Sequence, residues 1–144
     1  MRILDPHTGL EFLAPDECRA LLAARSGQVG RIAFAEGDRV VVLPVNYALA
    51  DDHLAFRTAH GAKLSHALDG GAASFEVDAL DEVTQTGWSV LVHGRARAVV
   101  APEEVARLDA LDLRVWATHA QKTSWVVVSI DSVTGRRIDL LTER

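Results

Sequence analysis

A long alternation of apolar and polar residues between Gly87 and Val100 constrains the fold of this chain more than any other feature of its sequence. Five apolar residues fall on one face of the predicted strand: Trp88, Val90, Val92, Ala96 and Val100. The other face carries Ser89, His93, Arg95 and Arg97, because successive side chains of a strand point to opposite sides. A strand of this length is typical of one that bends around a barrel, and Gly94 near its middle is the natural position for the bend.

Other segments repeat this alternation and are also predicted as strands. In the segment of residues 39–50 the odd positions from 41 to 49 are apolar and predict one buried face: Val41, Leu43, Val45, Tyr47 and Leu49. Two aspartates separate this segment from residues 53–59, so the two segments are predicted to form a β-hairpin. A further strand is predicted over residues 72–80, with Ala73, Phe75, Val77 and Ala79 facing inward. Residues 125–130, a turn at Thr134-Gly135 and a short run at 137–141 complete the β pattern.

Helices are predicted at three places. Pro15, followed by two acidic residues, begins a helix that ends near Arg25, since proline suits the first helical position and carboxylates suit the positive end of the dipole. Pro102 begins another, and residues 62–68 form a short one, while residues 117–123 are predicted as a loop. The expected core positions of the helix after Pro102 are Val105, Leu108 and Leu111. This order favours a mainly β fold, a small antiparallel Greek-key-like barrel with flanking short α-helices, over a βαβ fold.

Composition limits the classes of protein to which the chain can belong. Its 144 residues, 49% of them hydrophobic, suit one compact domain with its own core. The net charge of −5 argues against a protein that tracks nucleic-acid backbone. With Cys18 as the only cysteine, no intramolecular disulfide is expected. Residues 1–13 do not read as a secretory signal, and no apolar run approaches the roughly 20 residues of a membrane span. We therefore expect a cytoplasmic protein that is not bound to a membrane.

The segment from Arg57 to Lys63 gathers groups that bind anions. Arg57 can form two hydrogen bonds to a phosphate, and Thr58 supplies a hydroxyl. Gly61 and Ala62 would offer backbone N–H groups at the start of the short predicted helix, where Lys63 adds a positive charge. The set predicts a phosphate pocket. On physical grounds alone it is equally compatible with solvated charges and a turn glycine.

Three stretches of the chain, taken together, resemble the pyridoxamine 5′-phosphate oxidase-like family. They are Pro44-Val45-Asn46-Tyr47, then Phe56-Arg57-Thr58-Ala59 with Gly61 and Lys63-Leu64, then Gly87-Trp88-Ser89-Val90 through Gly94-Arg95-Ala96. The resemblance spans about Pro15 to Ile138. It implies a split β-barrel that binds FMN and dimerises, with two flavin sites at the subunit interface. It also divides the chain into an N-terminal extension, residues 1–14, and an FMN-binding split-barrel domain, residues 15–144.

The resemblance also implies which residues contact the flavin. Arg57, Thr58 and Lys63 fall on phosphate-binding positions. Pro44, Val45 and Asn46 lie along the isoalloxazine ring, and Trp88 and Ser89 match the segment that approaches the flavin from the partner subunit. The implied activity is that of a flavin-dependent oxidoreductase acting on a small molecule whose identity the sequence does not specify.

Several alternatives stay open at this point. Related split barrels bind the deazaflavin F420, and the same pocket could hold FMN in a non-catalytic or sensing protein. A third alternative is an interaction module with an empty barrel. Dedicated pyridoxamine 5′-phosphate oxidases continue into a longer carboxy-terminal segment that holds the substrate, so we expect this chain to turn over that substrate slowly.

The remaining polar residues carry weaker signals. The six histidines show none of the close pairings with Cys, Asp or Glu that metal sites use, so no metal site is predicted. His60, inside the predicted phosphate loop, could donate a hydrogen bond to an anion, although a turn residue is the preferred interpretation. Arg136 and Arg137 suit a ligand phosphate and a solvated surface equally well.

Overall fold

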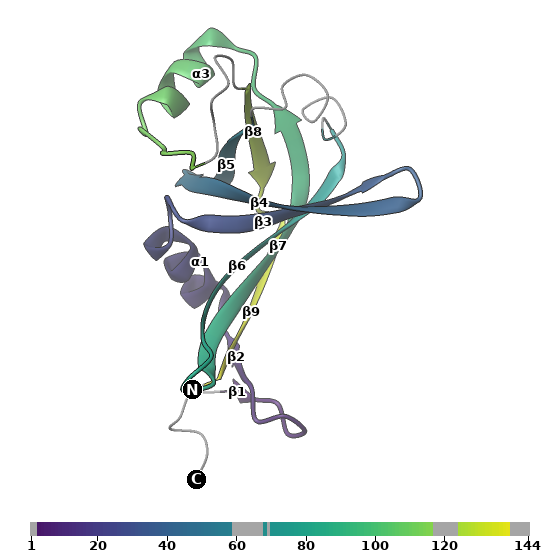
Figure 1. Cartoon of the computed structure of the whole chain (residues 1–144), viewed down its shortest axis with the longest axis vertical. Coiled ribbons are helices and arrows are strands. Elements are labelled where there is room, and N and C mark those ends of the chain that lie inside the picture. Colours follow the sequence, from purple (N-terminus) through teal and green to yellow (C-terminus); the bar gives the residue numbers. More distant parts are fainter. Residues whose placement is uncertain (1–2, 59–67, 69, 117–123, 139–144) are drawn as a thin grey trace.

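The computed structural model of the chain describes residues 3–58, 68, 70–116 and 124–138 (Figure 1). Within them the strands are β1 (Ile3–Leu4), β2 (Glu11–Leu13), β3 (Val29–Glu36), β4 (Arg39–Ala50), β5 (His53–Thr58), β6 (Ala72–Asp81), β7 (Thr86–Ala98), β8 (Ser124–Ser129) and β9 (Ser132–Ile138). The helices are α1 (Pro15–Ala24) and α3 (Pro102–Asp109). None of the helices in the described part of the chain is long and apolar enough to cross a bilayer.

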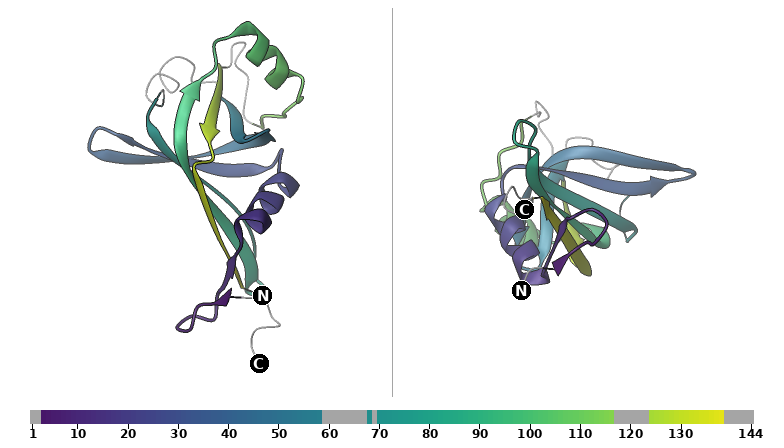
Figure 2. Two further views of the ribbon diagram at one scale, coloured as in Figure 1. Left: turned by 180° about the vertical axis from the view of Figure 1, so that it is seen from behind. Right: turned by 90° about the horizontal axis from the view of Figure 1, so that it is seen from below.

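Six antiparallel strands close into a barrel, which confirms the predicted fold class. Their order around the ring is β3, β4, β5, β8, β7 and β6, and β6 pairs with β3 to complete it. Strand β7 also pairs with β9, and β9 pairs with β2, so a second sheet branches from the barrel. Figure 1 shows this branch as a ribbon of β6, β7 and β9 that runs away from the end where β5 and β8 lie. The hairpin of β3 and β4 projects sideways from the barrel in both views of Figure 2.

The barrel divides where β7 passes Gly94. Residues up to His93 pair with β9, whereas Ala96 to Ala98 pair with β8. At the same level, Arg95 N donates to the Ser129 hydroxyl at 3.0 Å and Asp131 N donates to His93 O at 3.0 Å. A Cβ on Gly94 would meet the backbone carbonyl of Ser129, so only glycine allows this close approach. At the predicted bend at Gly94, β7 therefore passes from one sheet to the other, and at the same level the chain passes from β8 to β9.

Helix α1 packs against β9, β4 and β7 and closes one side of the barrel. Pro15 stands at its start, as predicted, and Cys18 and Leu22 are buried. The Tyr47 hydroxyl donates to Leu22 O at 2.6 Å, which ties the helix to β4. A Cβ on Gly135 would lie 2.6 Å from Cys18 Sγ, so glycine at this position lets the helix sit close to β9.

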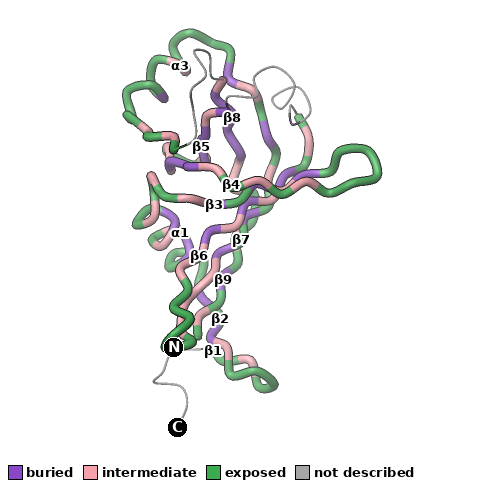
Figure 3. The backbone as a smooth tube through the Cα atoms, viewed as in Figure 1, coloured by how far each residue is buried: buried purple, intermediate pink, exposed green. Residues whose placement is uncertain are grey.

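The apolar side chains form two clusters. The larger one fills the barrel and includes Tyr47, Phe56 and Phe75, with Tyr47 and Phe75 packed edge to face at 5.4 Å between ring centroids. The smaller one lies under α3 and consists of Ala55, Val99, Leu108, Trp125 and Val127. Figure 3 shows that buried residues are concentrated in the barrel, whereas exposed residues lie along the β3–β4 hairpin and the outer side of α3.

Three details of the predicted fold are wrong. Thr134 and Gly135 lie inside β9 and do not form a turn, because β8 and β9 are both antiparallel to β7 and the chain continues past Ile130 and Asp131 in the same direction. Val100 is 84% exposed and Val99 is buried instead, since β7 ends at Ala98 and the alternation ends with it. Leu111 is exposed because α3 ends at Asp109.

Other expectations need a smaller adjustment or lie beyond the described residues. On β4 only Tyr47 of the predicted inward face is fully buried, while Val41, Leu43, Val45 and Leu49 are half-buried against the barrel cluster. The predicted helix at 62–68 lies outside the described residues apart from Leu68, and the predicted loop at 117–123 lies entirely outside them. Residues 3–4 and 11–13 of the predicted N-terminal extension form β1 and β2, at the edge of the sheet that contains β9.

Candidate functional site

The β4–β5 hairpin brings two of the predicted groups of site residues together. Tyr47 pairs with Phe56 at the end of the β4–β5 ladder. Asn46 and Arg57 are the next residues along the two strands; from there β4 continues beside β3, and β5 continues beside β8 as far as Thr58. Pro44 is exposed, Val45 is half-buried, and both Asn46 and Thr58 are buried. We call these residues, Pro44 to Asn46 with Arg57 and Thr58, the hairpin corner.

Asn46 holds the hairpin corner to its surroundings through both ends of its amide. Its Nδ2 donates to Gly27 O at 3.4 Å, and its Oδ1 accepts from Trp116 N at 3.1 Å. Asn46 also pairs with Val29 across the β3–β4 ladder. The side chain therefore links the segment after α1 to the segment after α3, and it fixes the backbone of β4 at this point.

Arg57 and Thr58 end strand β5 with groups suited to an oxyanion. The Arg57 guanidinium stacks on the Trp125 ring, 5.3 Å from its centroid, so one face of the guanidinium is covered by an aromatic surface. Thr58 is only 5% exposed and pairs with Ser124 of β8. The predicted partners His60, Gly61 and Lys63 lie outside the described residues.

Trp88 and Ser89 occupy a different part of the molecule. They lie on β7 opposite Ala79 and Asp78 of β6 and opposite Arg137 and Arg136 of β9. Ala98, at the far end of β7, pairs with β8 beside the hairpin corner. Ten residues of strand, up to about 33 Å, separate Trp88 from that end. In the sheet, β6 and β3 lie between β7 and β4, so Trp88 and Ser89 are not direct neighbours of the hairpin corner in one copy of the chain.

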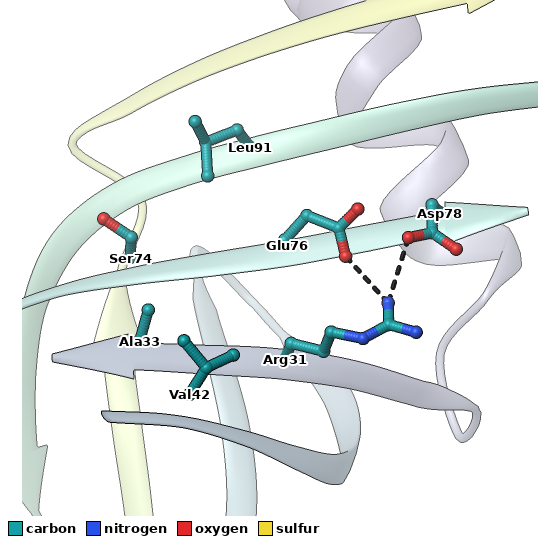
Figure 4. Close-up of a pocket in the computed structure, with 7 residues that line it drawn as sticks. All are labelled: Arg31, Ala33, Val42, Ser74, Glu76, Asp78 and Leu91. Carbon is teal, nitrogen blue, oxygen red and sulfur yellow. Dashed lines mark hydrogen bonds and ion pairs between the residues drawn. The ribbon is translucent and has the colours of Figure 1, made fainter. Parts of the chain in front are cut away.

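The outer face of the sheet carries an ion-pair cluster that the sequence analysis did not identify. Arg31 of β3 donates to Glu76 at 3.0 Å and to Asp78 at 2.9 Å, both on β6 (Figure 4). These residues line a pocket of about 320 Å³ with Val42 and Leu91. The sequence signal for this cluster is the pair of carboxylates two residues apart on a predicted strand, which places both on the same face. Their partner Arg31 lies 45 residues before Glu76, so no local pattern contains it.

Glu76 should make the stability of the protein depend on pH. Burial and the neighbouring Asp78 carboxylate raise the pKa of Glu76 to about 7, against the opposing effect of Arg31. The folded chain therefore keeps a proton on Glu76 that the unfolded chain has already lost, so the contribution of Glu76 to stability is greatest in acid and is lost as pH rises through about 7. We expect the free energy of unfolding to decrease by about 1 kcal/mol between about pH 5 and pH 8, given the partial exposure of this side chain.

Urea unfolding of the wild type and of Glu76→Gln across this pH range would measure the effect. The variant should lose the slope, because an amide carries no proton to release. Glu36→Gln, at an exposed position of β3, is the matched control and should keep the slope of the wild type. Equal slopes for wild type and Glu76→Gln would contradict this prediction.

Other arginines that the sequence singles out form ion pairs or aromatic contacts in the structure. Arg97 forms two hydrogen bonds to Glu104 of α3, at 2.8 and 2.9 Å, at the edge of a pocket of about 520 Å³ between α3 and the β4–β5 turn. Arg137 lies 3.7 Å from Glu11 and 3.8 Å from Glu17, and Arg136 covers the Phe12 ring. Within the described residues, no three His, Cys, Asp or Glu side chains are grouped as metal ligands would be.

The fold and sequence match known proteins over most of the chain. The family model described as pyridoxamine 5′-phosphate oxidase matches residues 14–137, and the chain belongs to this family. An uncharacterized Mycobacterium tuberculosis protein, Rv0080, is 34% identical over 95% of this chain and 92% of its own length.

Two solved structures with at least 30% identity are also similar. A candidate pyridoxamine 5′-phosphate oxidase from Corynebacterium glutamicum is 30% identical, with a TM-score of 0.79 over 91% of this chain and 99% of that one. An FAD binding protein from Mycobacterium smegmatis is 33% identical, with a TM-score of 0.70 over 89% of this chain and 99% of that one.

Proposed function

We propose that this protein binds a flavin nucleotide, FMN in the first place, with the flavin phosphate at the hairpin corner. The observation that carries the proposal is the junction of Arg57 and the buried Thr58 at the end of β5. A guanidinium and a hydroxyl on adjacent residues fit a phosphate monoester. Lys63 and the backbone around Gly61 follow directly in the sequence and would complete the pocket.

The flavin ring would lie along β4, over Pro44, Val45 and Asn46. Asn46 holds this backbone in place through its bonds to Gly27 and Trp116. A bound flavin supplies hydride or electron transfer, and the protein supplies position and exclusion of water. We therefore propose a flavin-dependent oxidoreductase that acts on a small molecule. A non-catalytic flavin-binding or sensing role is the alternative.

A homodimer would complete the site. Trp88 and Ser89 are separated from the hairpin corner by β6 and β3, so we expect them to contact a flavin that is bound by another copy of the chain. The outer sheet face carries exposed apolar side chains that suit such an interface: Val40 and Val42, 76% and 57% exposed, and Leu91. A two-fold dimer would give two equivalent flavin sites.

FAD is a second candidate ligand, because the similar Mycobacterium smegmatis protein is an FAD binding protein. The phosphate next to the riboflavin part of FAD could occupy the same corner as the phosphate of FMN. The deazaflavin F420 is a third candidate, and its long anionic tail would need a broader basic groove.

Purification followed by a visible spectrum tests the proposal. We expect a flavin spectrum, or its appearance when FMN is added, and mass spectrometry of the released ligand would distinguish FMN, FAD and F420. Sedimentation of the flavin-loaded protein should give a dimer. A protein that binds none of the three ligands would contradict the proposed function, and a monomer that holds flavin tightly would contradict the shared site.

A further inference from the structure

A pocket of about 480 Å³ lies between the end of α1 and the ribbon of β6 and β7. Arg25 enters it from the C-cap of α1, Asp78 and Asp81 from β6, and Thr86 and Gly87 from β7. Its volume is in the range of small-molecule sites, about 300–1,000 Å³. The pocket is separate from the hairpin corner and from the pocket around Arg31, with which it shares only Asp78.

Arg25 has a buried donor that nothing in the described part of the chain satisfies. Its Nε is inaccessible to solvent and has no hydrogen-bond partner there, and its side chain forms no hydrogen bond or ion pair with the described residues. Burial raises the pKa of the Tyr47 hydroxyl, and the positive charge of Arg25 opposes this effect. An unsatisfied buried donor is unfavourable, so its presence calls for an acceptor that arrives from outside.

The two acidic residues of the pocket do not serve as that acceptor. Asp78 accepts a hydrogen bond from Arg31 at 2.9 Å. One carboxylate oxygen of Asp81 accepts from Val83 N and Thr84 N, both at 3.0 Å, and so closes the turn between β6 and β7. Arg31 and Arg97 both pair with carboxylates, whereas Arg25 faces a pocket whose carboxylates are already engaged.

We propose that this pocket binds the carboxylate or phosphate group of a small organic ligand through the Arg25 guanidinium. The fork of a guanidinium matches either oxyanion with two parallel hydrogen bonds. Thr86 also lines the pocket, and its hydroxyl lies 2.7 Å from the Thr84 hydroxyl. Ala79 and Leu80 add an apolar wall, which suits an organic molecule better than a free inorganic ion.

The position of the pocket connects it to the proposed flavin site. Gly87 lines the pocket, and the next residue is Trp88, which we expect to approach the flavin of the partner subunit. A ligand anchored at Arg25 would therefore extend toward that flavin. We infer that the substrate is an organic acid or a phosphate monoester, and this assignment as substrate rests on the proposed function, whereas oxyanion binding at Arg25 does not.

NMR titration of the full-length, flavin-free protein tests the binding step directly. The probes are benzoate, phenyl phosphate and inorganic phosphate, with benzamide as an uncharged analogue of benzoate. The reporters are the Arg25 Nε–H resonance and the backbone amide of Gly87. We expect saturable shifts of both reporters with benzoate or phenyl phosphate, and at least about tenfold weaker binding of benzamide. Comparing phenyl phosphate with benzoate identifies which oxyanion the pocket prefers.

Variants of two arginines on the same helical segment complete the test. Arg25→Gln should weaken the binding of the preferred probe by about 10- to 100-fold, as the loss of a charged hydrogen bond predicts. Arg25→Lys should fall between it and the wild type, because lysine keeps the charge without the fork. Arg19→Gln removes the same charge from α1 outside the pocket and should bind as the wild type does.

The outcomes separate this proposal from the proposed flavin site. No saturable shift with any anionic probe, equal affinity for benzamide, or unchanged affinity in Arg25→Gln would each overturn the oxyanion site, whether or not the protein binds flavin. A saturable, Arg25-dependent shift in a protein that binds no flavin would support the oxyanion site and remove its assignment to a flavin substrate. Circular dichroism of each variant confirms that the fold is retained.

Discussion

Replacing Gly94 with alanine is expected to lower the free energy of unfolding by about 3 kcal/mol, because among the described glycines a Cβ at Gly94 would make the closest contact. The added Cβ would meet the carbonyl oxygen and carbon of Ser129, which belong to the backbone of β8. A side chain could rotate away from such a contact, but a paired strand cannot. The methyl group must therefore push β7 and β8 apart.

The cost is high because both neighbours of Gly94 are fixed by hydrogen bonds to the same segment. Arg95 N donates to the Ser129 hydroxyl, and His93 O accepts from Asp131 N. Moving β8 away from β7 lengthens both bonds at once. It also disturbs the pairing of Ala96 with Val128, next to buried side chains of the barrel cluster.

Thermal and urea unfolding of Gly94→Ala against Gly71→Ala would measure this effect. At Gly71 a Cβ would have only an ordinary contact, 3.4 Å from Leu68 O, so the same substitution should change stability by less than about 1 kcal/mol. For a chain of this size, 3 kcal/mol corresponds to a fall in Tm of about 10 °C. Similar stabilities for the two variants would show that the backbone contact at Gly94 is relaxed without cost.

The bend at Gly94 was predictable because its signal is local. An alternation that continues on both sides of a single glycine indicates one strand that changes direction. The position of Gly135 shows the limit of the same reasoning. Thr134-Gly135 has the residue types of a turn, but this glycine lies inside β9, where it makes room for Cys18 of α1. That contact joins residues more than 100 positions apart, and no local pattern contains it.

The hairpin corner and the two pockets that β6 lines also differ in whether their residues are brought together by local or by distant pairing. Asn46 and Arg57 directly follow the Tyr47–Phe56 pair because a hairpin joins their strands, so this placement follows from the sequence once the hairpin is recognised. The Arg31 cluster and the pocket at Arg25 join β6 to residues more than 40 positions earlier in the chain. Their formation depends on the pairing of β3 with β6 and on the docking of α1, which residue types alone do not specify.

Replacing Arg57 with alanine is expected to weaken FMN binding by about 1.5–3 kcal/mol, or about 10- to 150-fold. The proposed phosphate contact loses a guanidinium that Trp125 now holds in place by stacking. Riboflavin has no phosphate, so its affinity should stay nearly the same in the variant. Flavin fluorescence titrations of both proteins with both ligands would measure the four constants that the comparison needs.

The four constants separate a phosphate contact from a general loss of structure at the hairpin corner. Arg57→Ala also removes the stacking on Trp125, and any resulting disturbance of β5 would weaken riboflavin and FMN equally. The difference between the two losses isolates the interaction of Arg57 with the phosphate. Arg57→Lys should recover part of the FMN affinity, because it restores the charge but not the planar fork. If FMN and riboflavin lose the same free energy in Arg57→Ala, the phosphate lies elsewhere, and the hairpin corner is not the phosphate end of the flavin site.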